Sequence, residues 1–213
     1  MKIICRLMQC SASSFILAVA VLLFAGCRTA HEQPCCTPGT MASTPAPVTP
    51  AVVAAIPAAP APKAMPVRIK AGPAAAFTDA DGNPWLAEQG FADGDTTERP
   101  DLKIANTKTP VIYQSERYSM TAFSHPLPNG RYTVKLHFCE TFEGIEGPGQ
   151  RVFSFNVEGH EFKDFDIWVK AGGPLRAYIE TVNVEVTDGK LDITFTPNVE
   201  NPEINGIEII PVP

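Results

Sequence analysis

Short runs that alternate apolar and polar residues fill the chain from residue 67 onward, and they constrain its fold more than any other feature. The runs are residues 67–70, 132–138, 152–157, 182–186, 191–195 and 207–209. Successive side chains of a strand point to opposite faces, so each run predicts a strand with one buried face. No run shows the 3.6-residue period of an amphipathic helix. The pattern predicts an all-β domain over residues 67–213.

Turn signals separate these runs. Glu158-Gly159 predicts a turn after residues 152–157. Asp188-Gly189 is the strongest hairpin signal in the chain, because both residues tolerate positive φ, and it predicts that the two runs on either side pair with each other. Several strands with one apolar face each favour a two-sheet β-sandwich.

The N-terminus has the pattern of a lipoprotein signal peptide over residues 1–26. Lys2 and Arg6 supply positive charge, and residues 15–24 form an apolar run that is short for a membrane-spanning helix. Small residues then precede Cys27, as in the lipobox of bacterial lipoproteins. We therefore predict that Cys27 is lipidated. The alternative is an ordinary signal peptide followed by an incidental cysteine.

Residues 27–66 are predicted to be the lipidated cysteine and a disordered linker rich in Pro and Ala. Residues 37–66 carry one charge, Lys63, and no strand or helix pattern. Prolines favour an extended chain of about 3.1 Å per residue, so the linker could hold the domain roughly 100 Å from a membrane. The predicted location is the cell envelope. Arg28, which follows the cysteine, favours the outer membrane in a Gram-negative host.

Charge and cysteine spacing exclude several functions. The net charge is -6 and no stripe of Lys or Arg is present, so nucleic acid is not an expected partner. No cysteine spacing suits a metal, and no metal or cofactor is predicted. The adjacent Cys35 and Cys36 cannot easily bridge each other. Cys139 is expected to be a small apolar residue of a strand.

A turn with three polar side chains imitates the start of a calcium-binding EF-hand loop. Asp79, Asp81 and Asn83 have the spacing of the first ligands, but Pro84 stands where the loop needs glycine and Gly90 stands where it needs glutamate. We expect a polar turn here. A calcium site of another type stays open.

Six blocks of the domain resemble the malectin domain family and its bacterial modules. The blocks are residues 69–72, 77–85, 111–118, 136–142, 149–153 and 201–209. The resemblance implies a β-sandwich of jelly-roll, galactose-binding-like type, with a pocket built from loops at one end. It also implies that the pocket binds glucose-containing oligosaccharide through aromatic side chains and an acid.

The resemblance assigns pocket positions residue by residue. Tyr118 matches the aromatic residue after the Glu-Arg pair. Phe142 and Glu143 match a pair of aromatic residues in the family's pocket. Compared with that pair, Phe142 keeps the ring but lacks a hydroxyl group, and Glu143 has a carboxylate in place of a ring. Glu200 matches the acid before Asn-Pro and is one methylene longer than aspartate. A further pocket tyrosine falls in a loop near Phe91.

The residues by themselves point to the same end of the domain. Loop 140–149 offers an aromatic ring, acids and glycines, which suits a sugar but also suits a solvated loop. Trp85 is either a core residue or a ligand contact. We expect Tyr118 to face a ligand and Tyr113 to pack. Together the candidate carbohydrate-binding residues are Trp85, Phe91, Tyr118, Phe142, Glu143, Glu200 and Asn201.

Glu116 and Arg117 could form a structural ion pair. The sequence segment around Glu200 and Asn201 could also be a plain loop turn.

The sequence favours a surface-tethered module that binds oligosaccharide or polysaccharide without catalysis. A protein-interaction or envelope-scaffolding lipoprotein is the alternative. A glycosidase would need two carboxylates at a set separation, and nothing fixes that separation for the acids Glu140, Glu143, Glu146 and Glu200. His125, His137 and His160 have no nucleophile motif beside them.

Overall fold

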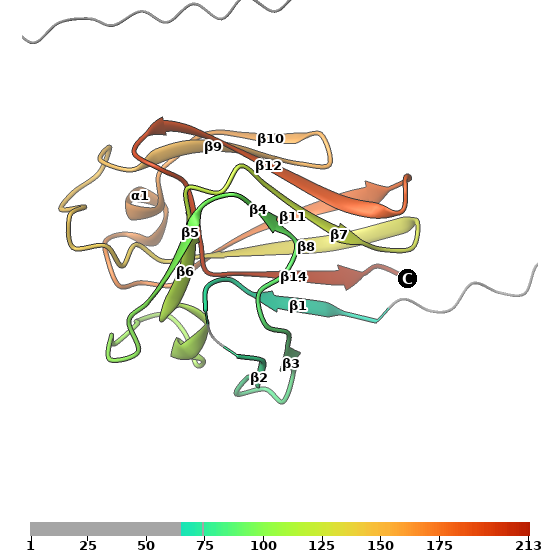
Figure 1. Cartoon of the computed structure of the whole chain (residues 1–213), viewed down its shortest axis with the longest axis horizontal. Coiled ribbons are helices and arrows are strands. Elements are labelled where there is room, and N and C mark those ends of the chain that lie inside the picture. Colours follow the sequence, from blue (N-terminus) through green and yellow to red (C-terminus); the bar gives the residue numbers. More distant parts are fainter. Residues whose placement is uncertain (1–64, 74) are drawn as a thin grey trace, which may run out of the picture. The chain divides into compact units, whose positions relative to one another are not determined.

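The computed structural model describes residues 65–73 and 75–213, and these residues are mostly β-structure. The predicted signal peptide, the lipidated Cys27 and the linker up to residue 64 lie outside the described residues. Two large sheets face each other across the core (Figure 1). The prediction of an all-β sandwich is therefore confirmed.

The first sheet has four antiparallel strands. Their order is β1 (Val67–Lys70), β14 (Gly206–Pro211), β8 (Gly130–Phe138) and β11 (Tyr178–Val186). The second sheet has five, in the order β10 (His160–Phe165), β9 (Val152–Val157), β12 (Lys190–Val199), β7 (Ala122–Pro126) and β4 (Phe91–Ala92). Each of the six predicted runs lies within one of these strands.

Alternation along the strands builds the core. In β9 every second side chain is buried, and Phe153 and Phe155 point inward from it. Phe138 comes from the opposite sheet, with ring centroids 6.1 Å from Phe153 and 4.9 Å from Phe165. Tilted aromatic contacts of this kind add to the free energy gained from apolar burial. The core therefore holds the two sheets in fixed relation and supports the loops at their ends.

The predicted Asp188-Gly189 hairpin is wrong. Strand β11 pairs with β8, whereas β12 pairs with β9 and β7, so this turn connects the two sheets. Gly189 has a φ of 87° and Asp188 has no positive φ, while the tight hairpin turn needs positive φ at both. By contrast, Glu158 and Gly159 have φ of 48° and 83°, and the turn predicted there is confirmed; the structure adds that it joins β9 and β10 as a hairpin.

A third sheet lies beside the sandwich, and the alternation of apolar and polar residues did not predict it. It consists of β5 (Asp95–Glu98), β6 (Ser115–Tyr118) and β13 (Glu203–Ile204), in the order β13-β6-β5. A two-stranded ribbon joins β2 (Phe77–Thr78) to β3 (Pro84–Trp85). Strands β5 and β6 carry mostly polar residues and show no apolar alternation, which explains why they were missed.

Helical structure is limited to two short elements in the described residues. They are η1 (Pro110–Ile112) and α1 (Ile167–Ala171). The Asp166 side chain caps α1 by accepting from Val169 N, and Gly172 ends it with a φ of 75°. Neither helix, in the part of the chain that the structure covers, is long and apolar enough to cross a membrane.

A smaller apolar cluster lies outside the main core. It contains Trp85, Ile104, Ile112, Tyr113 and Cys139. The Tyr113 hydroxyl lies 2.8 Å from Nδ1 of His137, and Nε2 of His137 lies 3.0 Å from Glu208 Oε1. Tyr113 thus packs inside the domain, as predicted. Cys139 is fully buried directly after β8, which fits its expected role as a small apolar residue.

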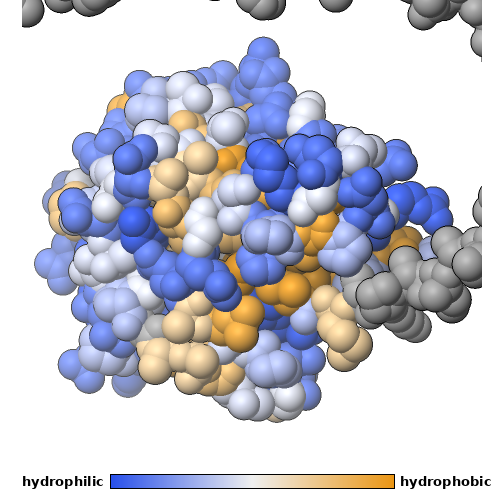
Figure 2. Space-filling view, turned by 45° about the vertical axis from the view of Figure 1, so that its right-hand side comes forward, coloured by the Kyte–Doolittle hydropathy of each residue, from blue (hydrophilic) through white to orange (hydrophobic). Residues whose placement is uncertain are grey.

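The surface gives one further clue to the site. Figure 2 shows one face on which hydrophilic side chains surround an area of hydrophobic ones. Scattered exposed apolar residues are normal for soluble domains. Among the large hydrophobic side chains exposed in the described residues, however, Phe142 is the one aromatic ring, with 46% of its surface accessible. An exposed ring is a natural contact for a ligand.

Candidate functional site

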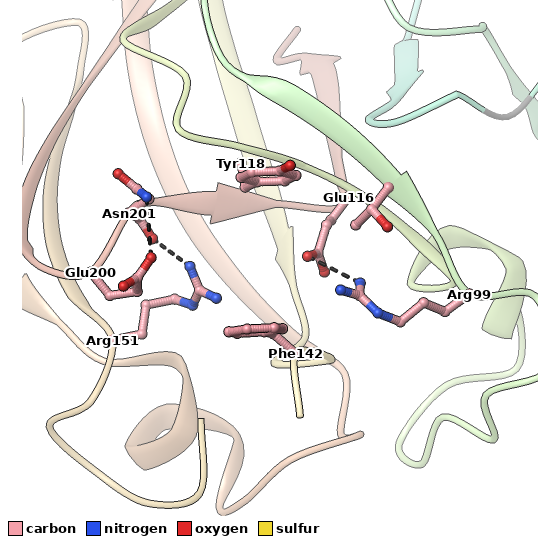
Figure 3. Close-up of a pocket in the computed structure, with 8 residues that line it drawn as sticks. Arg99, Glu116, Tyr118, Phe142, Arg151, Glu200 and Asn201 are labelled. Atoms are coloured by element: carbon pink, nitrogen blue, oxygen red, sulfur yellow. Dashed lines mark hydrogen bonds and ion pairs between the residues drawn. The ribbon is translucent and has the colours of Figure 1, made fainter. Parts of the chain in front are cut away.

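A pocket of about 250 Å³ lies where the third sheet meets the loops at one end of the sandwich (Figure 3). It is lined by Thr97, Arg99, Glu116, Tyr118, Phe142, Arg151, Glu200 and Asn201. The structure therefore brings together four of the predicted site residues: Tyr118, Phe142, Glu200 and Asn201. It adds four residues that the sequence did not single out as site residues.

The pairing of β5 with β6 places one wall of the pocket. Thr97 lies opposite Glu116 in the antiparallel register. Because alternate residues of a strand share a face, Glu116 and Tyr118 point to the pocket together, and Arg117 points away. Arg117 pairs instead with Glu88 on the other side of the sheet. Glu116 and Arg117 therefore do not form the ion pair that the sequence left open.

Two aromatic side chains face each other across the pocket. Figure 3 shows Tyr118 and Phe142 on opposite sides of the space, with both rings seen nearly edge-on. Gly144 helps to hold the Phe142 ring against its own loop. A Cβ atom at residue 144 would lie 2.5 Å from Phe142 Cε1, too close for any other residue type without movement of the ring.

Arg151 closes one side of the pocket and is 5% exposed. Its Nε donates to Glu140 Oε2 at 2.7 Å, and its Nη1 donates to the Asn201 carbonyl oxygen at 2.5 Å. Glu140 also accepts from the Phe142 backbone N–H at 3.0 Å. Burial alone would lower the pKa of Arg151, but Glu203 and Glu140 outweigh it and raise that pKa. Arg151 thus ties the Phe142 loop to the Asn201 loop.

Arg99 closes the opposite side. Its Nη1 lies 3.1 Å from Glu116 Oε1 and donates to Thr141 Oγ1 at 2.9 Å. Thr141 in turn donates to Glu116 Oε2 at 2.5 Å. Charge-assisted hydrogen bonds of this kind are short and directional, so Arg99 and Glu116 are fixed before any ligand arrives.

A buried acid lies within the same charged group. Glu203 is fully buried, and neither of its carboxyl oxygens has a hydrogen bond to the described residues. Burial raises the pKa of Glu203 well above its ordinary value, and the nearby Glu116 and Glu140 raise it further, while Arg151 acts in the opposite direction. This carboxyl group therefore keeps its proton to higher pH than an exposed glutamate.

The loop between β12 and β13 supplies the remaining acid. Glu200 adopts a φ of 60°, which is uncommon for a residue with a side chain. Asn201 Nδ2 donates to Glu200 Oε1 at 3.1 Å. Both residues are exposed at the pocket edge. An unusual backbone conformation beside a pocket is common at binding sites, because it aims a side chain that an ordinary loop would turn away.

Three predicted site residues lie outside this pocket. Trp85 is 1% exposed, stacks on Phe77 at 5.8 Å and donates from Nε1 to Asp79 Oδ2 at 3.0 Å. It is a core residue with no free face for a ligand, which corrects its assignment. Phe91 is partly buried and packs on Phe123 in the second sheet, with ring centroids 5.0 Å apart, and its assignment is corrected because it does not line the pocket.

Glu143 is exposed and lines a different pocket beside the Phe142 loop. Glu143 therefore does not line the pocket that contains Tyr118, and a role in binding a carbohydrate stays a prediction.

The sequence missed the two arginines because charged residues usually indicate a solvated surface. A signal was present for one of them, since Arg151 falls in a block that resembles the family. Nothing local marks Arg99, whose role depends on Glu116 across the third sheet.

The acidic turn at residues 79–83 is a hydrogen-bonded polar turn. The Asp79 carboxylate accepts from the backbone N–H groups of Asp81 and Asn83 and from the Trp85 indole. In residues 65–73 and 75–213, no group of three or more His, Cys, Asp or Glu side chains is placed to hold a metal ion.

Comparison with known proteins identifies the family. Residues 66–207 match the malectin domain. The chain belongs to the malectin domain family. This is a carbohydrate-binding family, which supports a binding module.

Curated malectins cover part of the chain. Malectin-B of Xenopus laevis is 33% identical over 101 residues, which are 43% of this chain and 36% of that protein. Malectin of Homo sapiens is 31% identical over 101 residues, covering 43% of this chain and 34% of that protein. The chain thus spans about a third of the length of these malectins. A probable leucine-rich repeat receptor-like kinase of Arabidopsis thaliana, At3g14840, is 32% identical over 130 residues, or 13% of its length.

Solved structures share the fold at low identity. A Bacteroides uniformis β-glucuronidase superposes with a TM-score of 0.61 at 19% identity, over 70% of this chain and 18% of that chain. The plant receptor-like kinase FER gives a TM-score of 0.59 at 23% identity, over 70% of this chain and 42% of that chain. At these identities the likeness establishes the malectin-type sandwich alone.

Proposed function

We propose that this malectin domain binds a carbohydrate in the pocket between Tyr118 and Phe142. The observation that carries the proposal is the pair of rings on opposite sides of one small pocket, with charged side chains between them (Figure 3). A sugar ring has apolar C–H faces and a polar edge of hydroxyl groups. Two rings suit the faces, and the charged groups suit the edge.

The charged groups offer both kinds of hydrogen bond. Arg99 and Arg151 are donors whose positions are fixed by Glu116 and Glu140. Glu200 is an exposed acceptor at the rim. Because the groups are held before binding, a ligand loses less free energy in ordering them. At about 250 Å³ the pocket is small for a ligand site, so it suits one sugar unit of a longer chain.

The arrangement supports binding without catalysis. A glycosidase needs a carboxylic acid and a second carboxylate on either side of the scissile bond. Glu116 is held by Arg99 and Thr141, and Glu140 is buried against Arg151. Glu200 is left as the exposed carboxylate among the pocket residues. The structural similarity to the β-glucuronidase covers 18% of the β-glucuronidase chain and indicates a shared fold only.

We further propose that the domain is tethered to the cell envelope through Cys27 and the Pro/Ala-rich linker. Two or three acyl chains would hold the protein firmly, since a single chain binds a membrane only marginally. Cys27→Ala should move the protein from the membrane to the soluble fraction. Unchanged membrane association of that variant would contradict the proposed anchor at Cys27.

A protein partner is the second candidate. One solved structure with this fold contains the plant peptide RALF23 in complex with FER and LLG2, at a TM-score of 0.59 and 19% identity. That complex supports a protein-binding role for a relative of the fold. An envelope protein bound by this chain would engage loops or sheet edges rather than the pocket.

A glycan array probed with the protein tests the proposal. We expect binding to one class of glycans, and loss of that signal in Tyr118→Ala and Phe142→Ala. Ile179→Ala is the matched control, because Ile179 is 43% exposed on β11 and does not line the pocket. An empty array would favour the protein-partner candidate.

A further inference from the structure

A second pocket, of about 280 Å³, shares Phe142 with the first. It is lined by Leu102, Glu140, Thr141, Phe142, Glu143, Ile145, Pro174 and Leu175. We propose that this pocket takes a small apolar substituent of the ligand whose sugar ring lies between Tyr118 and Phe142. The inference rests on the proposed function, and it names the ligand class as a glycan that carries an acyl, methyl or aryl group.

Three loops build the pocket, and backbone hydrogen bonds tie them together. Leu175 N donates to the Glu140 carbonyl oxygen at 3.0 Å, and Ala105 N donates to the Leu175 carbonyl oxygen at 2.8 Å. Gln114 Nε2 donates to the Leu102 carbonyl oxygen at 2.9 Å. The walls are therefore fixed by the fold, as the walls of ligand pockets usually are.

The lining is apolar in a way that sets this pocket apart from the first. Leu102 and Leu175 pack on the smaller apolar cluster and present their remaining surface to the pocket. Ile145, which is 7% exposed, and Pro174 complete the apolar wall. Burying an apolar group against such a wall is favourable at roughly 25 cal/mol per Å² of surface removed from water.

The two buried polar side chains of the second pocket, Glu140 and Thr141, are already engaged. Both Glu140 oxygens accept hydrogen bonds, from the Phe142 backbone N–H and from Arg151. The Thr141 hydroxyl accepts from Arg99 and donates to Glu116. A hydroxyl-rich sugar ring placed here would lose its hydrogen bonds to water with few replacements. An apolar group has no such bonds to lose.

Backbone geometry also marks the second pocket. Leu175 has a φ of 53°, a conformation that is a clear outlier for a bulky side chain. The hydrogen bonds on either side of it hold it there. Strain of this kind persists where the surrounding structure imposes it, and it tends to lie at ligand sites.

The second pocket shares residues with the first, which favours a single ligand that occupies both pockets. Phe142 lines both pockets, and Glu140 and Thr141 line the second pocket while binding the arginines that line the first. The two pockets therefore share the Phe142 side chain, so a group attached to a sugar that contacts this ring lies next to the second pocket. Glu143 is the exposed charge there, and it disfavours an anionic substituent.

The test uses the full-length protein and two kinds of probe. The first is 4-nitrophenol alone, at a pH well below the pKa of its hydroxyl group so that the probe is uncharged, followed by NMR of the methyl groups. The second is a matched pair, the methyl and 4-nitrophenyl glycosides of the sugar that the glycan array selects, titrated by calorimetry. We expect 4-nitrophenol to shift the methyl signals of Leu102, Ile145 and Leu175. We expect the 4-nitrophenyl glycoside to bind roughly tenfold more tightly than the methyl glycoside.

The variants separate the two pockets. Leu175→Asn makes the wall polar, and asparagine tolerates positive φ better than leucine does. In this variant the affinity for the 4-nitrophenyl glycoside should fall to that for the methyl glycoside. The affinity for the methyl glycoside should stay as in the wild type. Leu102→Asn is a second variant with the same expected result, and Leu86→Asn, at a residue 42% exposed elsewhere on the surface, is the control.

The outcomes are distinguishable. Equal affinities for the two glycosides in the wild type, or 4-nitrophenol shifts confined to other parts of the protein, would overturn the inference while the proposed function stood. A third outcome is that 4-nitrophenol shifts the methyl signals of the second pocket while the protein binds neither glycoside and no glycan of the array. That result would contradict both the proposed function and the inference that the apolar group is attached to a sugar. Tyr118→Ala should abolish binding of the methyl glycoside and leave the shifts by 4-nitrophenol in place.

Discussion

Glu203 lies directly opposite Tyr118 in the antiparallel pairing of β13 with β6. Directly opposed residues of a sheet project from the same face, so the two side chains point the same way. Tyr118 is partly exposed and lines the pocket, whereas Glu203 is fully buried. An unpaired buried acid is thus a direct neighbour of the proposed ligand contact.

Glu203→Gln should remove a pH dependence of stability. The pKa of Glu203 is raised above 4.5 in the folded chain, so above that pH the folded chain holds a proton that the unfolded chain has lost. Folding stability therefore falls as pH rises from 4.5 toward the folded-state pKa. Glutamine has no proton to lose, so the variant should gain stability relative to the wild type as pH rises.

Denaturant unfolding at a series of pH values measures this effect. The difference between the two curves reports Glu203 together with the neighbours Glu116, Glu140 and Arg151 that interact with it, because all other groups titrate alike in both proteins. Glu200→Gln changes an exposed glutamate of the same pocket and should follow the wild type. A constant difference between Glu203→Gln and the wild type from about pH 4 to 8 would show that Glu203 has the same pKa in the folded and the unfolded chain, and would contradict the raised pKa.

Arg151→Met should destabilise the domain by about 3–5 kcal/mol, because it leaves the Glu140 carboxylate buried without its partner. Chemical unfolding measures the loss. The double variant Arg151→Met/Glu140→Gln should recover a large part of it, since a neutral amide is less costly to bury. If the double variant is no more stable than the single one, the charge pair is not the source of the loss.

Gly94→Ala should distort the strand that carries Tyr118. Gly94 has a φ of 76°, and a Cβ atom there would lie 2.7 Å from Met120 N and closer still to the Tyr118 carbonyl oxygen. Positive φ alone costs roughly 1–2 kcal/mol for alanine, and the clash adds to that. Gly82→Ala is the matched control, with a φ of 83° and no atom within 4 Å of the added Cβ. Equal losses of unfolding free energy in the two variants would exclude the clash.

Lys70 should make stability rise with pH. Its ammonium group is fully buried and donates to the Ile112 carbonyl oxygen at 2.9 Å and to Ser115 Oγ at 2.6 Å. Burial lowers the pKa of Lys70 from 10.5 to about 8, although Glu98 and Glu88 oppose the shift. Between these values the unfolded chain binds more protons, so folding gains up to about 3 kcal/mol as pH rises.

Unfolding curves from about pH 8 to pH 10 test this rise. Burial also raises the pKa of the Cys139 thiol, which opposes part of the rise within this window, and above it the raised pKa values of Tyr113 and Tyr178 act in the same opposing sense, because the folded chain keeps protons that the unfolded chain loses. Lys70→Met should abolish the rise within the window. A rise of the same size in Lys70→Met would assign it to other groups.

The sequence predicted the sandwich because its strands alternate. In β9 and β12 one face is apolar, and that face is the one that the structure buries. It could not predict which sheet each strand joins. The Asp188-Gly189 turn has a local hairpin signal, but β12 already has neighbours on both sides, and long-range pairing outweighs the signal.

The site was predictable where an aromatic ring or acid stands in a recognisable block, as at Tyr118 and Phe142. It was not predictable where a residue acts through a distant partner. Arg99 is positioned by Glu116, and β5 and β6 show no alternation that would predict their pairing. Trp85 has the residue type of a sugar contact, and only its packing on Phe77 shows that it belongs to the core.

Calorimetric titration of the best array glycan into Tyr118→Ala and Phe142→Ala, with a melting curve for each variant, tests whether these two rings bind the carbohydrate. Both rings line the pocket, and Phe142 is 46% exposed, so truncation should cost far less than the roughly 3–5 kcal/mol of a buried aromatic. The account predicts that both variants lose glycan binding and melt close to the wild type and to Ile179→Ala. Unchanged affinity in both aromatic variants would contradict it.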